Sequence, residues 1–416
     1  MKEFFVLDDF DFDNKTVAAR IDLNSHFSDG KLLDNERFKA HSETIKYLME
    51  KNAKIVLLAH QGRRGEEDFT SLEQHAKLLE KYIGQEVKFA EKIIDEKTRE
   101  MIKNLKPGEV LLLNNVRYLL DEVLKSDPRF HLKSSLVQFL SPLIDFYVLD
   151  AFSVSHRAHS SIVGFALVKP MIAGKVMEKE IESKKEALKP LGINTWVLGG
   201  AKIDDCIKVM EFVLNNKPES VERILTGGVL ANLFLLADGY EIGFGSRKFL
   251  DRKGYFGLLE RAKNLLDFFR KEIILPKDVA IEKNGERVEV DVNEVPWEAT
   301  ILDIGERTIE HYSEIIEGSR TVILKGPLGV YERKGFEKGT KKILNCIGHA
   351  DVYSLIGGGD TSLALKVLGI DKSLFSHVSI GGGALITFLS GEKMPGIEAL
   401  KLSYQKFKKQ FLPFQH

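Results

Sequence analysis

The sequence predicts an α/β protein with two domains, each built on a parallel β-sheet. The chain has 416 residues, which is enough for more than one hydrophobic core, because single domains usually span about 100–200 residues. Short apolar segments alternate with charged segments of helical periodicity, and strands that alternate with helices pair in parallel. The apolar segments end in basic residues in the first half of the chain and in glycine loops in the second.

The first half contains four segments with the composition of buried strands, at residues 17–22, 55–59, 110–113 and 146–149. Helical patterns lie between them near residues 36–51 and 72–82. This order predicts a parallel sheet whose strands all end at the same edge.

Polar residues follow each of these strands, and they are rich in arginine and histidine. They are Asp22 and Asn24, His60 and Arg63, Arg117, and Asp150 with His156 and Arg157, while Arg37 stands at the start of the first helix. Ligands of open α/β sheets bind outside the carboxyl ends of the strands, so these side chains can converge on one cationic site. Several arginines together favour a small polyanion with carboxylate or phosphate groups. Each arginine alone also fits a solvated surface charge, and their common position after strands is the argument for a site.

A charged helical pattern covers residues 174–190 near the middle of the chain. It fits either an ordinary surface helix or a helix that joins two domains. We place the first domain at residues 1–172 and the second, with this helix, at residues 173–399. The amphipathic segment 400–416 is expected to pack back on the first domain.

The second half contains five glycine loops, each after a probable strand. They are Gly199-Gly200, Gly227-Gly228, Gly326-Pro327-Leu328-Gly329, Gly357-Gly358-Gly359-Asp360-Thr361 and Gly381-Gly382-Gly383. Glycine lets the main chain approach a ligand closely, amides at a helix start attract anions, and Asp360 offers a hard oxygen for magnesium. Turns at the rim of a packed sheet also use glycine, but five such loops favour a ligand that bears phosphate.

Composition and motifs exclude several classes of function. Lysine plus arginine (60) nearly balance aspartate plus glutamate (61), so the charge does not indicate a nucleic-acid partner. No apolar run reaches the roughly 20 residues of a membrane helix, and the early acidic residues do not fit a signal peptide. Cys206 and Cys346 lie in no zinc-binding spacing and favour a reducing compartment. GxGxxG after a strand, the P-loop, HRD and DFG are all absent. We therefore expect a cytoplasmic protein without a membrane or nucleic-acid partner.

Taken together, the motifs resemble those of the phosphoglycerate kinase family along nearly the whole chain. The similar segments are RIDLN at residues 20–24, HQGR at 60–63, LLNNVRY at 112–118, DAFSVSHRAHSS at 150–161, LGGAK at 198–202, GPLGVYE at 326–332, GGGDT at 357–361 and SIGGGA at 379–384. The resemblance implies two doubly wound, Rossmann-like domains that face each other across a cleft and are joined by a helix and a hinge. It implies reversible phosphoryl transfer from 1,3-bisphosphoglycerate to MgADP, giving 3-phosphoglycerate and MgATP, in glycolysis and gluconeogenesis, with domain closure.

The resemblance also implies roles for individual residues. Phosphoglycerate would be bound by Asp22, Asn24, Arg37, His60, Arg63, Arg117 and Arg157. The nucleotide, ATP or ADP as co-substrate, would be bound by Gly199, Gly200, Lys202, Gly228, Leu302, Lys325, Pro327, Val330, Glu332, Gly357, Gly358, Gly359, Asp360 and Thr361. Asp360 would also hold Mg²⁺, and catalytic roles would fall to Arg37, Lys202, Gly359 and Gly382.

The chain departs from the family pattern at several positions. Cys206 stands where many members have a second lysine, Lys325 where they have asparagine, and Ile380 where they have threonine. Such changes resemble those of archaeal members. They leave two hypotheses, an active phosphoglycerate kinase and a binding protein that has lost transfer. A sugar or acid kinase of another α/β type would not explain the four arginines. The sequence does not decide between a monomer and a homodimer, or between adenine and guanine.

Overall fold

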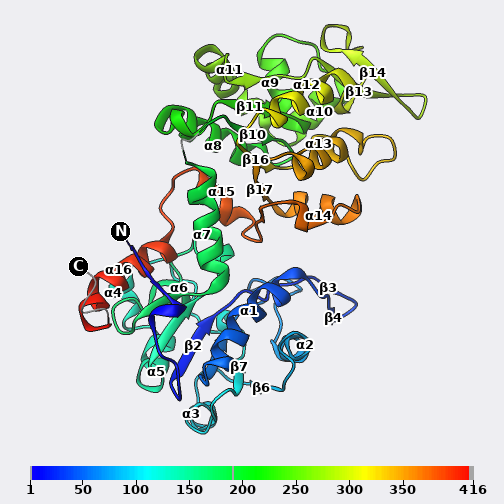
Figure 1. Ribbon diagram of the computed structural model, residues 1–416. Helices are drawn as coiled ribbons and strands as arrows, with labels where there is room; N and C mark the ends of the chain where they lie inside the picture. Colours follow the sequence, from blue (N-terminus) through cyan, green and yellow to red (C-terminus); the bar gives the residue numbers. More distant parts are fainter. Residues whose placement is uncertain (1, 190–191, 412–416) are drawn as a thin grey trace. The chain divides into compact units, whose positions relative to one another are not determined.

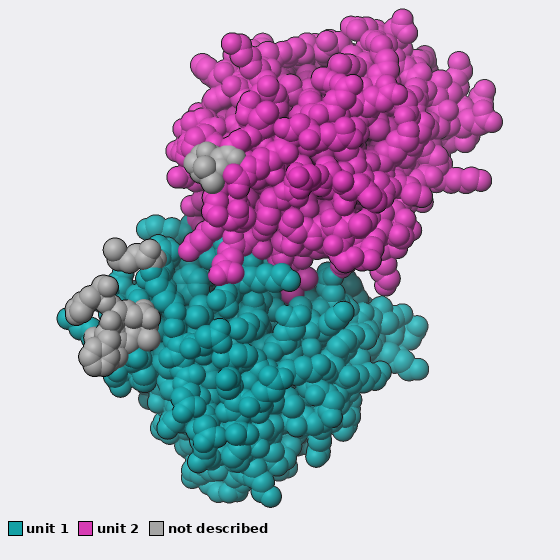
Figure 2. All heavy atoms as spheres, viewed as in Figure 1, with its two compact units in different colours: residues 1–181, 393–416 teal, residues 182–392 magenta. Residues whose placement is uncertain are grey.

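The computed structural model describes residues 2–189 and 192–411 (Figure 1). The chain divides into two compact units, Met1–Ile181 with Lys393–His416, and Glu182–Glu392 (Figure 2). We call these unit 1 and unit 2. Each contains its own parallel sheet and its own hydrophobic core.

Unit 1 is built on a seven-stranded sheet with the order β1-β9-β8-β2-β5-β7-β6, in which every pair is parallel. The strands are β1 (Phe5–Val6), β2 (Thr16–Arg20), β5 (Lys54–Leu58), β6 (Val87–Ala90), β7 (Val110–Leu113), β8 (Phe146–Leu149) and β9 (Met171–Ala173). The central strands are buried along almost their whole length. This explains why they are continuous apolar runs in the sequence.

Helices cover this sheet and fix the loops at its carboxyl edge. They are α1 (Glu36–Glu50), α2 (Glu73–Ile83), α3 (Glu96–Lys103), α4 (Pro128–His131), α5 (Ser135–Leu140), α6 (Ser160–Val163) and α16 (Pro395–Phe411), and a small hairpin of β3 (Phe27–Ser28) and β4 (Lys31–Leu32) adds to them. Helix α1 begins after Asn35, whose side chain accepts the Arg37 N–H at 2.9 Å, an N-cap bond that stabilises the first turn. Phe38, Ile45 and Leu48 of α1 are buried in the unit 1 core.

Helix α7 (Lys175–Ala187) starts at the end of β9, and the division between the units falls within it. One carboxylate oxygen of Asp150 accepts the N–H groups of Val176 at 2.9 Å and Met177 at 3.3 Å, and the other bonds the His41 Nδ1 at 2.8 Å. The position of Asp150 after a strand predicts a place near the ligand. In the structure, this buried carboxylate instead caps the start of α7.

Unit 2 is built on a six-stranded sheet with the order β12-β11-β10-β16-β17-β18, again parallel throughout. The strands are β10 (Asn194–Leu198), β11 (Arg223–Thr226), β12 (Ile273–Ile274), β16 (Thr321–Lys325), β17 (Tyr353–Gly357) and β18 (His377–Val378). Five of them run directly or within a few residues into the five glycine loops, so all of these loops lie at the carboxyl edge of one sheet.

The helices of unit 2 are α8 (Ile203–Asn216), α9 (Gly228–Ala237), α10 (Phe244–Arg252), α11 (Leu259–Phe269), α12 (Glu306–Glu317), α13 (Lys338–His349), α14 (Gly359–Val367) and α15 (Gly383–Leu389). A second, antiparallel sheet has the order β14-β13-β15, with β13 (Asp278–Lys283), β14 (Glu286–Asp291) and β15 (Ile301–Ile304). The alternation of strands and helices in the sequence did not predict this sheet. Over residues 2–189 and 192–411, the helices are too short or too polar to span a bilayer.

Candidate active site

Basic residues gather at the carboxyl edge of the unit 1 sheet around Asp22, which lies two positions after the end of β2. The Asp22 carboxylate lies 2.7 Å from the Arg37 Nη1 and 3.8 Å from the His60 Nδ1. It also accepts the Asn24 N–H at 3.0 Å and the Ser153 hydroxyl. Asp22 thus holds Arg37, from the start of α1, next to His60, from the loop after β5.

The buried Asp22 carboxylate is an ionised anchor. Burial by itself would raise its pKa, but the Arg37 charge and the hydrogen bonds from Ser153 and Asn24 lower the pKa well below the ordinary value. An acid held this strongly in its charged form does not carry protons. Its role is to orient the guanidinium of Arg37.

Arg117 and Arg157 lie close enough to repel each other. Burial lowers the pKa of Arg117 to about 10, and the charges of Arg157 and Arg20 act in the same direction. Burial also lowers the pKa of Arg157, together with the charge of Arg63. Both groups remain charged at neutral pH, so the site is a concentrated positive field that a bound anion would stabilise.

The backbone around Gly62 joins the remaining predicted residues to this group. The Asn24 side-chain oxygen accepts the Gly62 N–H at 2.9 Å, and an Arg117 guanidinium nitrogen donates to the Gly62 carbonyl. Arg63, in contrast, has a side chain that is 67% exposed and lies 3.9 Å from Glu66. The structure therefore brings all seven predicted residues into one hydrogen-bonded or charge-coupled group, with the exposed Arg63 joined to it only through its charge near Arg157.

Three further buried residues support this site and were not among the predicted ones. The Arg20 Nε donates to the Ser161 hydroxyl at 2.9 Å, and its Nη2 lies 3.1 Å from the His60 Nδ1. The Glu122 carboxylate accepts the Ser161 N–H at 2.8 Å and its hydroxyl at 2.6 Å. Burial raises the pKa of Glu122 to about 7, although the Arg20 charge and the Ser161 bonds oppose this. A charged residue inside an apolar strand was a signal for Arg20, whereas Glu122 follows no pattern.

Arg20 also determines how His60 presents its ring. Burial and the Arg20 charge hold the pKa of His60 well below its ordinary value, so the imidazole is neutral. A guanidinium can only donate, so the His60 Nδ1 is the acceptor and the ring proton is on Nε2. His60 therefore offers an N–H donor at its other side.

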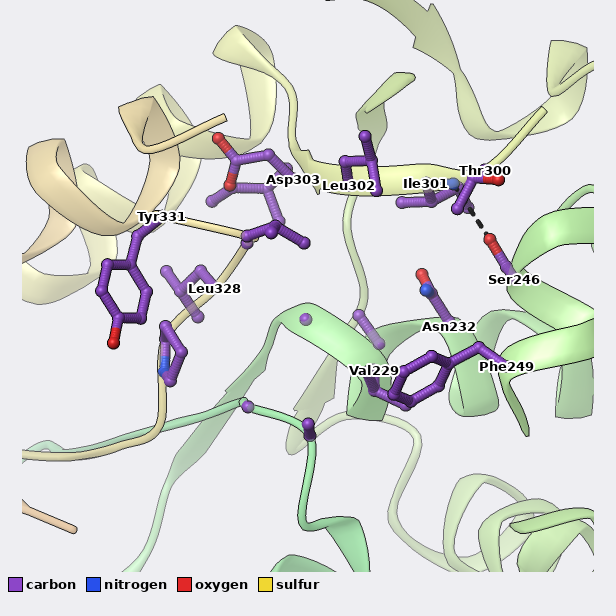
Figure 3. A pocket seen from close by; sticks show the side chains of 18 of the residues that line it. Val229, Asn232, Ser246, Phe249, Thr300, Ile301, Leu302, Asp303, Leu328 and Tyr331 are labelled. Atoms are coloured by element: carbon purple, nitrogen blue, oxygen red, sulfur yellow. Dashed lines mark hydrogen bonds between the residues drawn. The ribbon is translucent and has the colours of Figure 1, made fainter. Parts of the chain in front are cut away.

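In unit 2, two adjoining cavities lie at the carboxyl edge of the sheet. The larger has a volume of about 530 Å³, and its lining includes eight predicted residues, Gly200, Lys202, Gly228, Leu302, Pro327, Val330, Glu332 and Asp360 (Figure 3). The smaller has a volume of about 270 Å³ and includes Gly199, Gly200, Lys202, Lys325, Gly358, Gly359, Asp360, Thr361 and Gly382. Gly200, Lys202 and Asp360 line both, so the cavities meet there. Gly357, which ends β17, lines neither of the two.

The glycine loops pack so tightly that side chains are excluded. The Gly200 N–H donates to the Pro327 carbonyl at 2.7 Å, and the Gly199 N–H to the Lys325 carbonyl at 2.8 Å. A Cβ at Gly326 would lie closer than 3.0 Å to the Gly199 carbonyl oxygen, and Gly326 has a φ of +82°. Glycine is needed at position 326 for both reasons.

Asp360 and Lys202 form the polar boundary between the two cavities. The Lys202 Nζ lies 3.7 Å from the Asp360 Oδ2, and both side chains are more than half exposed. Among the described residues, no cluster of three or more His, Cys, Asp or Glu could hold a metal ion. One accessible carboxylate at a helix start fits Mg²⁺, which is commonly bound by one or two carboxylates together with substrate phosphates.

Thr361 has a structural role in these loops. Its buried hydroxyl accepts the Gly326 N–H at 2.8 Å and donates to the Gly357 carbonyl at 2.8 Å. The hydroxyl proton is therefore already used, and the side chain as placed here cannot donate to a phosphate. The N–H groups in the first turn of α14, including that of Thr361, face no acceptor within the helix and fit an anion better.

Lys325 places its ammonium group next to Cys206, the position at which many family members have a second lysine. Its Nζ lies 3.3 Å from the Cys206 Sγ, 3.5 Å from the Lys202 carbonyl oxygen and 4.0 Å from the Asp205 Oδ2. Burial raises the pKa of the Cys206 thiol although Lys325 opposes this. Cys206 is thus a packed, protonated helix residue, and Lys325 provides a cation beside it.

The family model with the description Phosphoglycerate kinase matches residues 7–392 of the chain. The chain belongs to the phosphoglycerate kinase family. It is 45% identical to the phosphoglycerate kinase of Methanopyrus kandleri over 395 residues, which cover 95% of this chain and 96% of that protein. It is 42% identical to that of Thermococcus sibiricus over 409 residues, with coverage of 97% and 98%.

Solved structures of phosphoglycerate kinases agree with this assignment. The crystal structure of the Pyrococcus horikoshii enzyme superposes with a TM-score of 0.88 at 42% identity, covering 97% of this chain and 100% of that one. The structure from Coxiella burnetii has a TM-score of 0.78 at 30% identity, with coverage of 95% and 98%. The predicted family, its archaeal character and the α/β fold with parallel sheets are confirmed. As a phosphoglycerate kinase family member, the chain is a kinase with 3-phosphoglycerate and ATP or ADP as substrates.

Proposed function

We propose that the chain catalyses reversible phosphoryl transfer from 1,3-bisphosphoglycerate to MgADP, giving 3-phosphoglycerate and MgATP. The observation that carries this proposal is the pairing of two different anion sites in one chain. Unit 1 has a cluster of buried and half-buried, mutually repelling arginines. Unit 2 has a glycine-lined cavity that joins Lys202 and Asp360 to an apolar chamber. The first suits a small polyanion and the second a nucleotide.

At the first site, we propose that Arg37, Arg117 and Arg157 bind the carboxylate and phosphate groups of phosphoglycerate. Asp22 fixes Arg37 at 2.7 Å, and Asn24 fixes the loop that carries Arg63. His60 would donate through Nε2–H because Arg20 occupies Nδ1. Rigid donors of this kind stabilise charge without reorganising during the reaction. The domain predicted at residues 1–172 with 400–416 would therefore hold phosphoglycerate.

At the second site, we propose that the first-turn amides of α14 and the Gly382 loop face the nucleotide phosphates, together with Lys202 and Lys325. The base and ribose would lie in the larger cavity between Gly228, Leu302, Pro327, Val330 and Glu332. Mg²⁺, held by Asp360 and the phosphates, would neutralise charge on the nucleotide. The domain predicted at residues 173–399 would thus hold the nucleotide.

The transfer itself needs positioning and positive charge more than acid–base chemistry. The phosphorus–oxygen bond to the carboxyl group of 1,3-bisphosphoglycerate breaks, and a bond to the terminal phosphate oxygen of ADP forms, with no proton to remove because both oxygens are ionised. Arg37 and Lys202 would stabilise the charge on the moving group. Because the two proposed sites belong to different units, we also propose that the units close before transfer.

A coupled assay tests this proposal. 3-Phosphoglycerate with MgATP should give 1,3-bisphosphoglycerate, detected by its NADH-dependent reduction with glyceraldehyde-3-phosphate dehydrogenase, over a temperature series. Calorimetric nucleotide binding without product at any temperature would instead support a binding protein that has lost transfer. The cytoplasmic location and the choice between monomer and homodimer remain predictions, and light scattering after gel filtration would decide the second.

A further inference from the structure

Asn232 is a buried polar residue inside the larger cavity of unit 2. It lies on α9, one helical turn after Gly228, and is 6% exposed. Its Oδ1 has no hydrogen-bond partner among residues 2–189 and 192–411. In Figure 3 its amide lies between Ile301 and Leu302 on one side and Val229 and Phe249 on the other. The amide therefore faces the interior of the cavity.

The Ser246 hydroxyl and one Asp303 oxygen, both in the same cavity, already have partners. The Ser246 hydroxyl oxygen accepts the Ile301 N–H at 2.9 Å, the bond drawn in Figure 3. The Asp303 Oδ2 accepts from Arg287 at 2.7 Å and from the Gly339 N–H at 2.8 Å. The Asp303 Oδ1, like the Asn232 Oδ1, has no hydrogen-bond partner among the described residues, but it lies in a tight space, since a Cβ at Gly329 or Gly339 would lie closer than 3.0 Å to it.

The environment of Asn232 has the character of a purine site. Its neighbours Val229, Phe249, Ile301 and Leu302 are apolar and suit the faces of a flat aromatic ring, whereas the amide suits a polar ring edge. A buried amide oxygen without a donor is unfavourable, so a ligand that supplies an N–H at this point gains affinity. Asparagine is well suited to a purine edge because it offers a donor and an acceptor side by side.

We propose that Asn232 reads the substituent at the six-position of the purine base. Its Oδ1 accepts from the exocyclic amine of adenine while its Nδ2 donates to the neighbouring ring nitrogen. If the amide is rotated by 180°, its Nδ2 donates to a carbonyl at the six-position and its Oδ1 accepts from the adjacent ring N–H equally well. A hydrogen at the six-position leaves the amide without one of its partners. This inference rests on the proposed function, because it places the base in the larger cavity.

The test compares three triphosphates that differ only at this edge: ATP, inosine triphosphate and purine riboside triphosphate. In the coupled assay, the wild-type kcat/KM for ATP and for inosine triphosphate should be about tenfold higher than that for purine riboside triphosphate. This ratio corresponds to one buried hydrogen bond of ~1.4 kcal/mol. In Asn232→Leu the three values should fall within about threefold of one another. Asn232→Asp offers acceptors only, whereas each of the two bases presents one donor and one acceptor at this edge, so ATP and inosine triphosphate should both lose about tenfold or more in kcat/KM relative to the wild type.

The matched control is Asn216→Leu, on the exposed side of α8, where the amide only bonds the Phe212 carbonyl at 3.0 Å. It should retain the wild-type ratios, and thermal unfolding reports whether each variant folds. A wild type that does not distinguish ATP from purine riboside triphosphate, or an Asn232→Leu variant that keeps the tenfold ratio, would overturn the inference. If Asn232→Leu does not fold, an Asn232→Asp variant that keeps the wild-type kcat/KM for both ATP and inosine triphosphate overturns it instead. Absence of product from the wild type with every triphosphate would instead contradict the proposed function.

Discussion

The two anion sites of this chain are formed by different parts of the polypeptide. The site in unit 1 consists of side chains, in which buried and half-buried arginines are held by carboxylates, amides and carbonyl groups. The site in unit 2 consists mainly of backbone, in which glycine loops are held by bonds between main-chain atoms. The first should therefore depend on charge and protonation, and the second on the space between loops. Single substitutions can separate these two dependences.

Neutralising Arg37 should have the largest effect of all. Arg37→Ala should lower kcat by about 10³-fold or more, because one preorganised cation near the moving phosphoryl group is worth this much in phosphoryl transfer. The coupled assay measures kcat. Arg129→Ala, at an exposed position of α4, is the control and should change it less than twofold. Equal kcat values for the two variants would show that Arg37 is an ordinary surface charge.

Filling the space at Gly326 should disable the backbone site without changing any charge. Gly326→Ala should lower nucleotide affinity at least tenfold and destabilise unit 2 by about 3 kcal/mol, which combines left-handed strain with overpacking against Gly199. Calorimetry and urea denaturation measure the two effects.

Gly369→Ala separates strain from overpacking. Gly369 has a φ of +66° and open space around its Cβ position, so this variant should lose only about 1 kcal/mol and bind nucleotide normally. If both variants bind nucleotide equally well, close loop packing is not what forms the site.

Lys325 adds a charged side chain to a site that is otherwise mainly backbone. Moving this charge from position 325 to position 206 tests its role. Lys325→Asn should lower kcat by roughly 10- to 100-fold, since it removes one cation beside the phosphate cavity. Adding Cys206→Lys should restore most of this loss, because the two side chains approach within 3.3 Å. Lys366→Asn, on the exposed face of α14, is the control. A double variant no better than Lys325→Asn would show that position 325 acts in another way.

The final test is a pH dependence of stability that arises from Glu122 in the side-chain site. The folded-state pKa of Glu122, about 7, lies above its ordinary value of 4.5. Between pH 4.5 and 7 the folded protein therefore binds more protons than the unfolded chain, so this group lowers stability as the pH rises. Glu122→Gln should relieve up to about 3 kcal/mol at pH 8 and much less at pH 5. Denaturation at both pH values measures the difference, and an equal effect at both would contradict it.

The parts of the fold set by local pattern could be predicted from the sequence. The strand at residues 55–59 is β5, shifted by one residue, and the helix near 36–51 is α1, which ends one residue earlier. The hairpin of β13 and β14 was not predicted, although its Asn284-Gly285 turn, with φ values of +54° and +81°, is a strong hairpin signal.

The residues of the two sites also divide into those that the sequence pattern predicts and those that it does not. Arginines after strands and glycines in loops could be predicted as site residues from the sequence, because the edge of a parallel sheet brings them together. Glu122, Ser161 and Asn232 could not be found in this way, since they are ordinary loop or helix residues whose importance comes only from what they contact. The Thr361 hydroxyl is the opposite case, because the motif predicts a phosphate ligand and packing turns the hydroxyl inward.

The last helix gives the chain a particular order of assembly. Helix α16 belongs to unit 1, where buried Ser403 accepts the Met171 N–H at 2.8 Å and Tyr404 packs on Phe5. It follows all of unit 2 in the sequence. On the ribosome, unit 2 therefore emerges whole before the helix that covers the β1–β9 edge of unit 1. The half of the protein that is made first should be the last to reach its final packing.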